Sequence, residues 1–479
     1  MVAESNARPT RSGGQPRTGI VTAMTSVVPR IRMPRRLRNL ELGLLAFAFG
    51  IVVAAEVLVQ LGANGEIDGS LAFFGVGLGI LVFGVHIALR VTAPDADPFI
   101  LPIATLLNGI GIAMIYRLDI HDGTSGWDAA SVRQIAWTAF AIICAIVVLI
   151  FVRNHRSLQR YTYLSGLISI VLVFVPLLPV IGTRNESAKV WIQIGAFNFQ
   201  PGEIAKITLA IFFAGYLVQR RDSLAAVGTR VLGVTFPRAR DLGPVAVLWV
   251  LTLLVILFER DLGTGLLYFG LFVAMIYVAT GRTSWALLGV AALVGGAWAV
   301  NLLSSSIPKL GYVHGRFENW LNPFADAQFN GQGGSFQLVQ GLFGLAHGGL
   351  LGSGLGQGQP WVTPVANSDY IFASLGEELG LIGVFALLSL YMLFVARAFR
   401  IGFASEDDFG KLLAIGLGFV VALQTFVVVG GITRVIPVTG LTAPFLAAGG
   451  SSLVANWIIV ALLLRLSDTV RNQPRAMSS

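Results

Sequence analysis

YIFASLGEELGLIGVFALLSLYMLFVA, residues 370–396, is a long run of mostly apolar residues. It contains no Lys or Arg, and its only acidic side chains are the adjacent Glu377 and Glu378. An α-helix needs about 20 predominantly apolar residues to cross a bilayer, so this run is long enough. It lacks the strict alternation of a barrel strand, and hydrocarbon offers unpaired backbone groups no partner. It therefore predicts a membrane-spanning helix.

The composition extends this prediction to the whole chain. Of its 479 residues, 55% are hydrophobic and only 12% are charged, and the mean hydropathy is +0.76. Soluble domains carry about 25% charged residues. So much apolar sequence cannot be buried in a water-soluble core, and lipid must be the solvent for much of it. We expect an all-α, polytopic integral membrane protein.

About twelve apolar runs qualify as transmembrane helices. The predicted spans lie at residues 42–61, 70–91, 99–116, 134–152, 161–181, 203–218, 243–258, 262–280, 284–303, 370–396, 411–431 and 441–464.

The net charge of +8 is concentrated where it indicates topology rather than nucleic-acid binding. Residues 1–39 form a basic tail that holds many arginines and the single acid Glu4 before the first span begins. Such a cluster is typical of a cytoplasmic segment next to anionic lipid. The loops that would lie inside all contain Lys or Arg, as the positive-inside rule requires. We therefore expect both termini, including residues 467–479, in the cytoplasm, and no nucleic-acid partner.

Two predicted outside loops are long, at about 182–202 and 304–369. The second is the longest segment without a spanning run, and long loops without a structural duty are usually functional or disordered. Its many aromatic residues argue against disorder. Apolar residues recur at helical spacing from Phe336 to Ala346, which predicts an amphipathic helix on the bilayer surface.

Charges at membrane depth are expensive unless they are partnered, so they are candidate functional residues. Glu203 and Lys206 lie one turn apart after Pro201, where a helix cap and an i,i+3 ion pair explain them equally well. Asp261 precedes a span and could also be a cap.

Glu377 and Glu378 cannot both face the buried stripe of one helix, so at least one must meet a polar cavity or a cation. Arg434 lies outside, near the last span, and could supply that cation or bind an anionic headgroup.

Other motifs are weak. The glycine-rich residues 352–358 lack the preceding strand and following helix of a dinucleotide-binding loop, which favours flexible backbone, such as a hinge. Ser306 and Lys309 match a Ser-x-x-Lys pattern without the other transpeptidase motifs. The single Cys144 excludes a disulfide within the chain, and the five histidines show no metal-ligand spacing.

An ordered set of short motifs resembles the FtsW/RodA (SEDS) family of bacterial shape, division and sporulation proteins. The matching segments are Pro201–Lys206, Asp261–Thr264, Arg316 followed by Leu321–Asp326, Gly348–Leu350, Gly354–Gly356, Asp369, Glu377–Gly380 and Pro437–Leu441. The resemblance covers about residues 100–465, and it is most like an actinobacterial RodA. It implies a ten-helix core at 99–466, preceded by two additional helices at 40–98.

The resemblance also implies an activity. Family members polymerise lipid II, a disaccharide-pentapeptide on undecaprenyl pyrophosphate, at the outer face of the cytoplasmic membrane. By analogy Asp326 is the catalytic base, and a cation must meet the departing pyrophosphate. The expected cavity and substrate-binding residues are Glu203, Lys206, Asp261, Arg316, Asp369, Glu377 and Arg434.

A divalent cation, Mg²⁺ or Mn²⁺, is a reasonable companion of the pyrophosphate, although no dedicated metal cage is visible in the sequence. The absence of transpeptidase motifs implies a separate class B penicillin-binding protein as partner. Two alternatives remain open: a lipid II flippase, because twelve spans with intramembrane carboxylates also suit a transporter, and a non-catalytic scaffold for cell-wall synthesis.

Overall fold

The fold is described from a computed structural model. It covers residues 34–178, 182, 190–194, 197–224, 230–231, 234–235, 247, 250–251, 254–255, 258–304, 311–331 and 333–473. Helices dominate this part of the chain. They are α1 (Pro34–Asn64), α2 (Ser70–Thr92), α3 (Ile100–Asp122), α4 (Ala130–Phe151), α5 (Arg156–Gln159), α6 (Thr162–Phe174), α7 (Pro201–Leu224), α9 (Leu262–Thr280), α10 (Thr283–Leu303), α11 (Gly311–Leu321), α12 (Asp326–Phe329), α13 (Phe336–Gly348), α14 (Ile371–Ala404), α15 (Asp408–Ile432) and α16 (Gly450–Arg471).

Short elements complete the description. The 3-10 turns are η1 (Gly126–Asp128), η2 (Val175–Leu177) and η5 (Pro360–Val362). Two antiparallel hairpins join β1 (Ile192–Ile194) to β2 (Phe197–Phe199) and β3 (Arg230–Val231) to β4 (Val234–Thr235). In the first hairpin Gln193 pairs with Asn198.

Ten of the described helices are long and apolar enough to cross a bilayer. An eleventh apolar segment, Thr162–Leu177, is shorter and corresponds to the predicted span at 161–181. The predicted span at 243–258 lies largely outside the described residues, as do most of the basic tail and part of the 182–202 loop. The chain is therefore an all-α, multi-pass membrane protein, as the sequence predicts.

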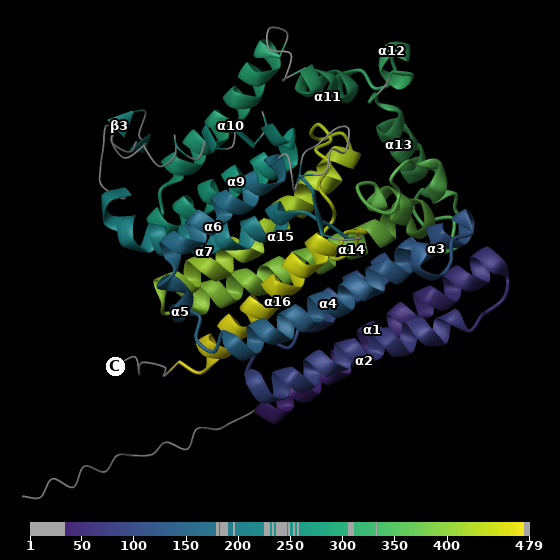
Figure 1. The fold of residues 1–479 in the computed structure, drawn as a ribbon, viewed down its shortest axis with the longest axis horizontal. Helices are drawn as coiled ribbons and strands as arrows, with labels where there is room; N and C mark the ends of the chain where they lie inside the picture. Colours follow the sequence, from purple (N-terminus) through teal and green to yellow (C-terminus); the bar gives the residue numbers. More distant parts are fainter. Residues whose placement is uncertain are drawn as a thin grey trace, which may run out of the picture.

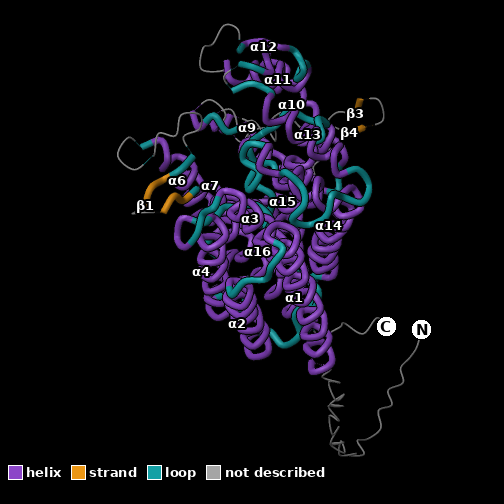
Figure 2. The backbone as a smooth tube through the Cα atoms, turned by 90° about the vertical axis from the view of Figure 1, so that its right-hand side faces the viewer, coloured by secondary structure: helices purple, strands orange, loops and turns teal. Residues whose placement is uncertain are grey.

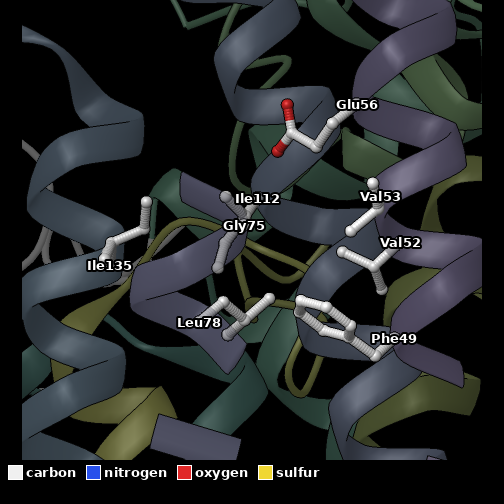
Figure 3. Close-up of a pocket in the computed structure, with 8 residues that line it drawn as sticks. All are labelled: Phe49, Val52, Val53, Glu56, Gly75, Leu78, Ile112 and Ile135. Atoms are coloured by element: carbon white, nitrogen blue, oxygen red, sulfur yellow. The ribbon is translucent and has the colours of Figure 1, made fainter. Parts of the chain in front are cut away.

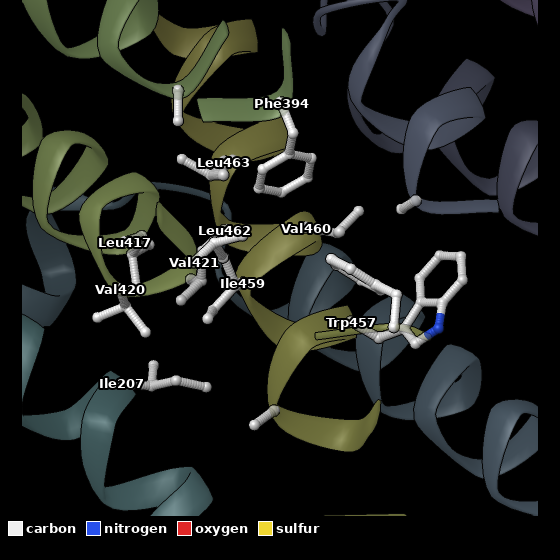
Figure 4. Close-up of a cluster of buried hydrophobic side chains, with 14 of the residues drawn as sticks. Ile207, Phe394, Leu417, Val420, Val421, Trp457, Ile459, Val460, Leu462 and Leu463 are labelled. Carbon is white, nitrogen blue, oxygen red and sulfur yellow. The ribbon is translucent and has the colours of Figure 1, made fainter. Parts of the chain in front are cut away.

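The helices form one bundle with an added pair along its edge. In Figure 1, α1 and α2 run side by side at the edge of the bundle, and α1 packs on α3 while α2 packs on α4. The interior is built from α7, α15 and α16, whose buried side chains include Ile207, Val420 and Trp457 (Figure 4). Packing of side chains, rather than the hydrophobic effect, drives such association in lipid.

Several predicted span boundaries differ from the helices by six residues or more. α1 begins at Pro34 rather than at residue 42, and α14 continues to Ala404 rather than ending at residue 396. The span predicted to end at residue 116 continues as α3 to Asp122, because Arg117 is buried in the helix instead of starting a loop. The span predicted to begin at residue 441 begins at Gly450.

Residues 437–449 between α15 and α16 are irregular, and prolines and glycines account for this because they interrupt helices. Their backbone is nevertheless partnered. Gln424 Nε2 donates to the Thr442 carbonyl at 2.8 Å, and Gln134 Nε2 donates to the Ala447 carbonyl at 3.0 Å. Irregular backbone inside a membrane protein requires such internal partners.

The long predicted outer loop contains α11, α12 and α13, which gather beyond one end of the bundle (Figure 2). The amphipathic helix predicted at 336–346 is present as α13. Leu338 and Val339 are buried, and α13 packs on α14. Phe336 and Phe343 are 40% and 54% exposed, so much of the predicted apolar stripe faces outward.

Candidate functional site

A buried lysine connects three spanning helices. Lys206 on α7 donates from Nζ to Glu203 Oε2 at 2.5 Å and to Gln424 Oε1 of α15 at 2.9 Å, and Asn456 Oδ1 of α16 lies 3.4 Å away. Lys206 is 1% exposed. Pro201 and Glu203 occupy the first turn of α7, where both residue types are favourable. The i,i+3 pair that the spacing allows is therefore present, and its cation also binds two distant amides.

Asp261 caps α9. Its Oδ1 accepts the Thr264 backbone N–H at 3.0 Å and its Oδ2 accepts the Thr264 hydroxyl at 2.6 Å. Burial raises the pKa of this carboxyl, and the hydrogen bonds from Thr264 lower it. The cap that the sequence allows is thus observed.

Arg316 and Asp369 approach each other beside Gly440. A Cβ at position 440 would lie 3.7 Å from Asp369 Oδ2 and 3.9 Å from Arg316 Nη2. Arg316 also donates from Nη1 to the Val438 carbonyl at 2.8 Å. Burial raises the pKa of Asp369 to about 6, while the Arg316 charge opposes this rise. The same guanidinium lowers the pKa of Asp261. We call Asp261, Arg316 and Asp369 the Arg316 cluster.

The helix that carries Glu377 and Glu378 is broken. Gly380 has φ 67° and ψ −176° in the middle of α14, a conformation that favours glycine. The break frees backbone groups, and residues 349–358, the glycine segment, satisfy them. The Ser353 and Gly354 N–H groups donate to the carbonyls of Glu377 and Glu378, each at 3.0 Å, and the Leu381 N–H donates to the Gly349 carbonyl at 2.9 Å.

The two glutamates have separate partners. Glu378 Oε1 accepts from Arg117 Nε of α3 at 3.2 Å, and its Oε2 accepts the Gly356 N–H at 2.9 Å. Arg117 also donates to the Gly358 carbonyl and lies 4.8 Å from the Trp361 ring. The expectation that one glutamate meets a cation is correct, but the proposed cation is not.

Glu377 faces the outer loop. Its Oε1 accepts the Gln359 N–H at 2.8 Å and lies 3.2 Å from His347 Nδ1. Arg434, proposed above as the cation for this pair of acids, instead donates from Nη2 to the Leu321 carbonyl at 3.4 Å, and its own carbonyl accepts from Trp320 Nε1. Arg434 is therefore hydrogen-bonded to the C-terminal end of α11.

The glycine segment is also held by the added helix pair. A Cβ on Gly62 of α1 would lie 2.2 Å from the Leu355 carbonyl oxygen and 3.0 Å from the Gly356 Cα. A side chain at position 62 would therefore collide with backbone. The hinge expected from these glycines is wrong, because the segment is clamped between α1, α3 and α14 by contacts and hydrogen bonds.

Asp326 stands apart from these groups. It is the first residue of α12 and is exposed, and its carboxylate makes no hydrogen bond or ion pair with the described part of the chain. A tight turn presents it, since the Ser335 hydroxyl donates to the Pro323 carbonyl at 2.6 Å and the Ser335 N–H donates to the Gln328 carbonyl at 2.9 Å. The structure does not bring Asp326 into the Arg316 cluster.

Three residues of the site are not predicted by the sequence analysis: Arg117, Gln424 and Asn456. Arg117 reads as the start of a loop, and the two amides lie inside apolar runs. A polar side chain in a spanning helix is itself a signal of function, and it would have singled out Gln424 and Asn456.

A metal cage is not built by the described residues, which contain no group of three or more His, Cys, Asp or Glu side chains that could hold an ion. Magnesium commonly binds one or two carboxylates together with substrate phosphates and waters. The charges of Asp369 and Asp261 lie close enough to interact, and the Arg316 guanidinium acts on both carboxyls.

These features define a polytopic membrane protein with a broken helix and a charged cluster beneath a folded outer loop. Residues 98–472 match the FTSW_RODA_SPOVE family, described as cell cycle protein. The chain belongs to this family.

Curated relatives extend over nearly the whole chain. The peptidoglycan glycosyltransferase RodA of Mycobacterium tuberculosis strain H37Rv is 42% identical over 446 residues, which cover 92% of this chain and 93% of the relative. The probable peptidoglycan glycosyltransferase FtsW of Geobacter metallireducens is 30% identical over 384 residues, 79% of this chain and 96% of that protein.

Solved structures share the fold. A chain from a structure entitled "Structural coordination of polymerization and crosslinking by a peptidoglycan synthase complex" superimposes with a TM-score of 0.61 at 24% identity, covering 79% of this chain and 99% of that one. Thermus thermophilus RodA gives a TM-score of 0.53 at 22% identity over 79% of this chain and 98% of its own.

Proposed function

We propose that this chain is a peptidoglycan glycosyltransferase that polymerises lipid II into glycan strands for cell elongation and shape. The observation that carries the proposal is its 42% identity, over 92% of the chain, to a mycobacterial protein of that name. The geometry supports it, because the outer loop offers an unpaired carboxylate and a cation close to the ends of spanning helices.

The reaction needs a base and a site for negative charge. The 4-hydroxyl of one sugar attacks the anomeric carbon of another, the bond from that carbon to the pyrophosphate oxygen breaks, and configuration inverts. We assign proton acceptance to Asp326, whose exposed carboxylate is unpaired among the described residues. The proton moves from the attacking hydroxyl to this carboxylate, and the lipid pyrophosphate leaves as an anion.

Arg316 is the cation best placed for the departing pyrophosphate. It is half-buried and already faces Asp369 and Asp261. Lys206, the other candidate, is enclosed by three side-chain partners within the bundle. Mg²⁺ or Mn²⁺ would neutralise further negative charge on the pyrophosphate. The ion would arrive bound to the substrate rather than at a metal site formed by protein side chains.

The topology proposed for this reaction places α11, α12 and α13 outside the cell and both termini in the cytoplasm. The basic tail and the Lys- and Arg-containing loops support this orientation. The partner proposed for cross-linking is a class B penicillin-binding protein, and the fold shared with a chain of a polymerising and cross-linking complex supports it.

The decisive experiment is polymerisation in detergent. Purified full-length protein with its transpeptidase partner should convert fluorescent lipid II into long glycan, resolved on a gel, although no transport is possible there. Movement of labelled lipid II across liposomes without any glycan in detergent would establish the flippase instead. A scaffold would bind the partner and show neither activity.

A further inference from the structure

The added helix pair, α1 and α2, leaves a small gap where it packs against α3 and α4 of the core. A narrow internal pocket of ≈10 Å³ lies where α1 and α2 meet α3 and α4. Figure 3 shows its lining, which comes from all four helices. The residues are Phe49, Val52, Val53, Glu56, Gly75, Leu78, Ile112 and Ile135. Every side chain in this set is apolar except that of Glu56.

A larger groove adjoins this pocket. It has a volume of ≈520 Å³ and shares Phe49, Val53 and Gly75 with it. Its other lining residues run from the α1–α2 turn down α2: Ile67, Asp68, Val76 and Gly79. A volume of this size lies within the range of small-molecule sites.

Glu56 is the unexplained group of this region. It is 4% exposed, and its Oε2 has no hydrogen-bond partner among the described residues. Among the described residues, none that lines the pocket is a cation. An isolated buried carboxyl takes its neutral form rather than carry an unpaired charge, and a neutral carboxyl has an O–H to donate. A ligand that supplies an acceptor would satisfy it.

The depth of Glu56 points to the kind of acceptor. Glu41 pairs with His86 at one end of α1, and Gln60 lies near the other end, within 3.3 Å of the Tyr116 hydroxyl. At 1.5 Å per residue these two polar groups are about 28 Å apart, close to the thickness of the hydrocarbon core. Glu56 then lies about 6 Å inside the boundary at the α1–α2 turn. Lipid ester carbonyls are the acceptors available near such a boundary.

We propose that this groove binds one acyl chain of a membrane glycerolipid, whose ester carbonyl oxygen reaches into the adjoining pocket and accepts a hydrogen bond from Glu56. The mouth faces the bilayer, since Val76 beside it is 61% exposed and Ile80 is 69% exposed. The ≈10 Å³ inner pocket has room for about one oxygen-sized atom, and a hydrocarbon chain can lie along the ≈520 Å³ groove beside it. The bound acyl chain would lie against α1 and α2 of the added pair. This inference does not rest on the proposed enzymatic activity.

The test counts lipid on the full-length protein by native mass spectrometry. The probe is dioleoyl phosphatidylglycerol, added to delipidated protein at graded concentrations. Wild type should retain one molecule tightly. Gly75→Leu fills the groove, with only Val53 near its Cβ at 4.0 Å, and should abolish that tight binding. Gly77→Leu is the matched control, because no atom of the described residues would lie within 4 Å of its Cβ and Gly77 lines neither cavity.

A second pair of measurements tests the hydrogen bond. Glu56→Leu should weaken retention about fivefold, whereas Glu56→Gln keeps donor groups and should bind like wild type. The diether analogue of the same lipid lacks ester carbonyls. It should bind wild type about fivefold more weakly than the ester lipid, and the two lipids should bind Glu56→Leu equally.

Equal retention by the Gly75→Leu and Gly77→Leu variants would mean annular lipid only and would overturn the proposal. So would identical binding of ester and diether lipids by wild type. If Gly75→Leu fails to fold, Val76→Trp serves in its place, because this exposed residue lines the mouth and can block it from the lipid side. Size-exclusion profiles and thermal unfolding verify the fold of each variant.

Discussion

Asp326 and Asp369 belong to the same outer loop, yet the fold gives them opposite surroundings. Asp326 is exposed at the start of α12 and unpaired within the described chain. Asp369 lies beside Arg316 just before α14, and burial raises its pKa to about 6. This contrast shows that an acid in this loop can either be unpaired, and so available to accept a proton, or interact with a neighbouring charged side chain. Sequence position alone does not separate the two.

Removing the free carboxylate should have the largest effect on activity. Asp326→Ala should reduce lipid II polymerisation by at least about 100-fold, since a positioned base contributes that much or more. Its thermal unfolding should be unchanged, because the side chain is exposed and unpaired. Asp128→Ala, another exposed acid in a short turn, is the charge-matched control and should stay active. Normal glycan from Asp326→Ala would remove Asp326 from the role of base.

Breaking the buried ion pair should instead act on stability. Arg117→Met leaves Glu378 without its cation, and loss of one partner of a buried pair costs about 3–5 kcal/mol. Thermal unfolding in detergent should show a marked decrease in Tm. The double variant Arg117→Met/Glu378→Leu should regain much of this loss, because no unpaired charge remains. If the single variant lost activity with an unchanged Tm, the pair would belong to the chemistry.

The pH profile separates Asp369 from Asp326. Above pH 6 Asp369 is ionised opposite Arg316, and at pH 5 only about a tenth of it remains ionised. Polymerisation by wild type should therefore fall as the pH is lowered through about 6, and Asp369→Asn should show low activity without that fall. An unchanged profile in the variant would assign the titration to another group.

The same carboxyl should affect stability with the opposite sign. Because burial raises its pKa above the ordinary value, the folded state holds the proton more tightly than the unfolded chain does. This group therefore favours folding more as the pH falls through about 6. On lowering the pH from 7 to 5, the Tm of Asp369→Asn should therefore increase less, or decrease more, than the Tm of wild type.

The smallest effect is expected at Gly440. This residue has φ 81°, so Gly440→Ala should cost about 1 kcal/mol of stability. Its new methyl would also contact Asp369 and Arg316, and the KM for lipid II should increase a few-fold. Gly281→Ala shares the backbone cost at φ 67° but has nothing within 4 Å of its Cβ. An equal change in KM for both variants would exclude a role for the contact.

Much of the fold follows from local patterns. Hydropathy predicts that the described spans exist, but several of their ends differ from the helices. Two of these differences have a clear cause, because Arg117 is buried within α3 and the proline-containing residues 441–449 are buried without forming a helix. The candidate site is less predictable, because the partners of Glu378 and Lys206 lie on helices far away in the chain.

The amino-acid sequence alone indicated that this chain crosses a bilayer, roughly where its spans lie, that a long aromatic loop interrupts them and, through ordered motifs, which family it belongs to. Such properties depend on residues that are near one another along the chain. The tertiary structure was needed to show which acid of that loop is unpaired and which lies beside Arg316. It also showed that Arg117, not Arg434, pairs with Glu378, and that a small pocket with a lone carboxyl lies where the added helices meet α3 and α4. These outcomes depend on which helices become neighbours, since burial and charge pairing are set by contacts across the bundle.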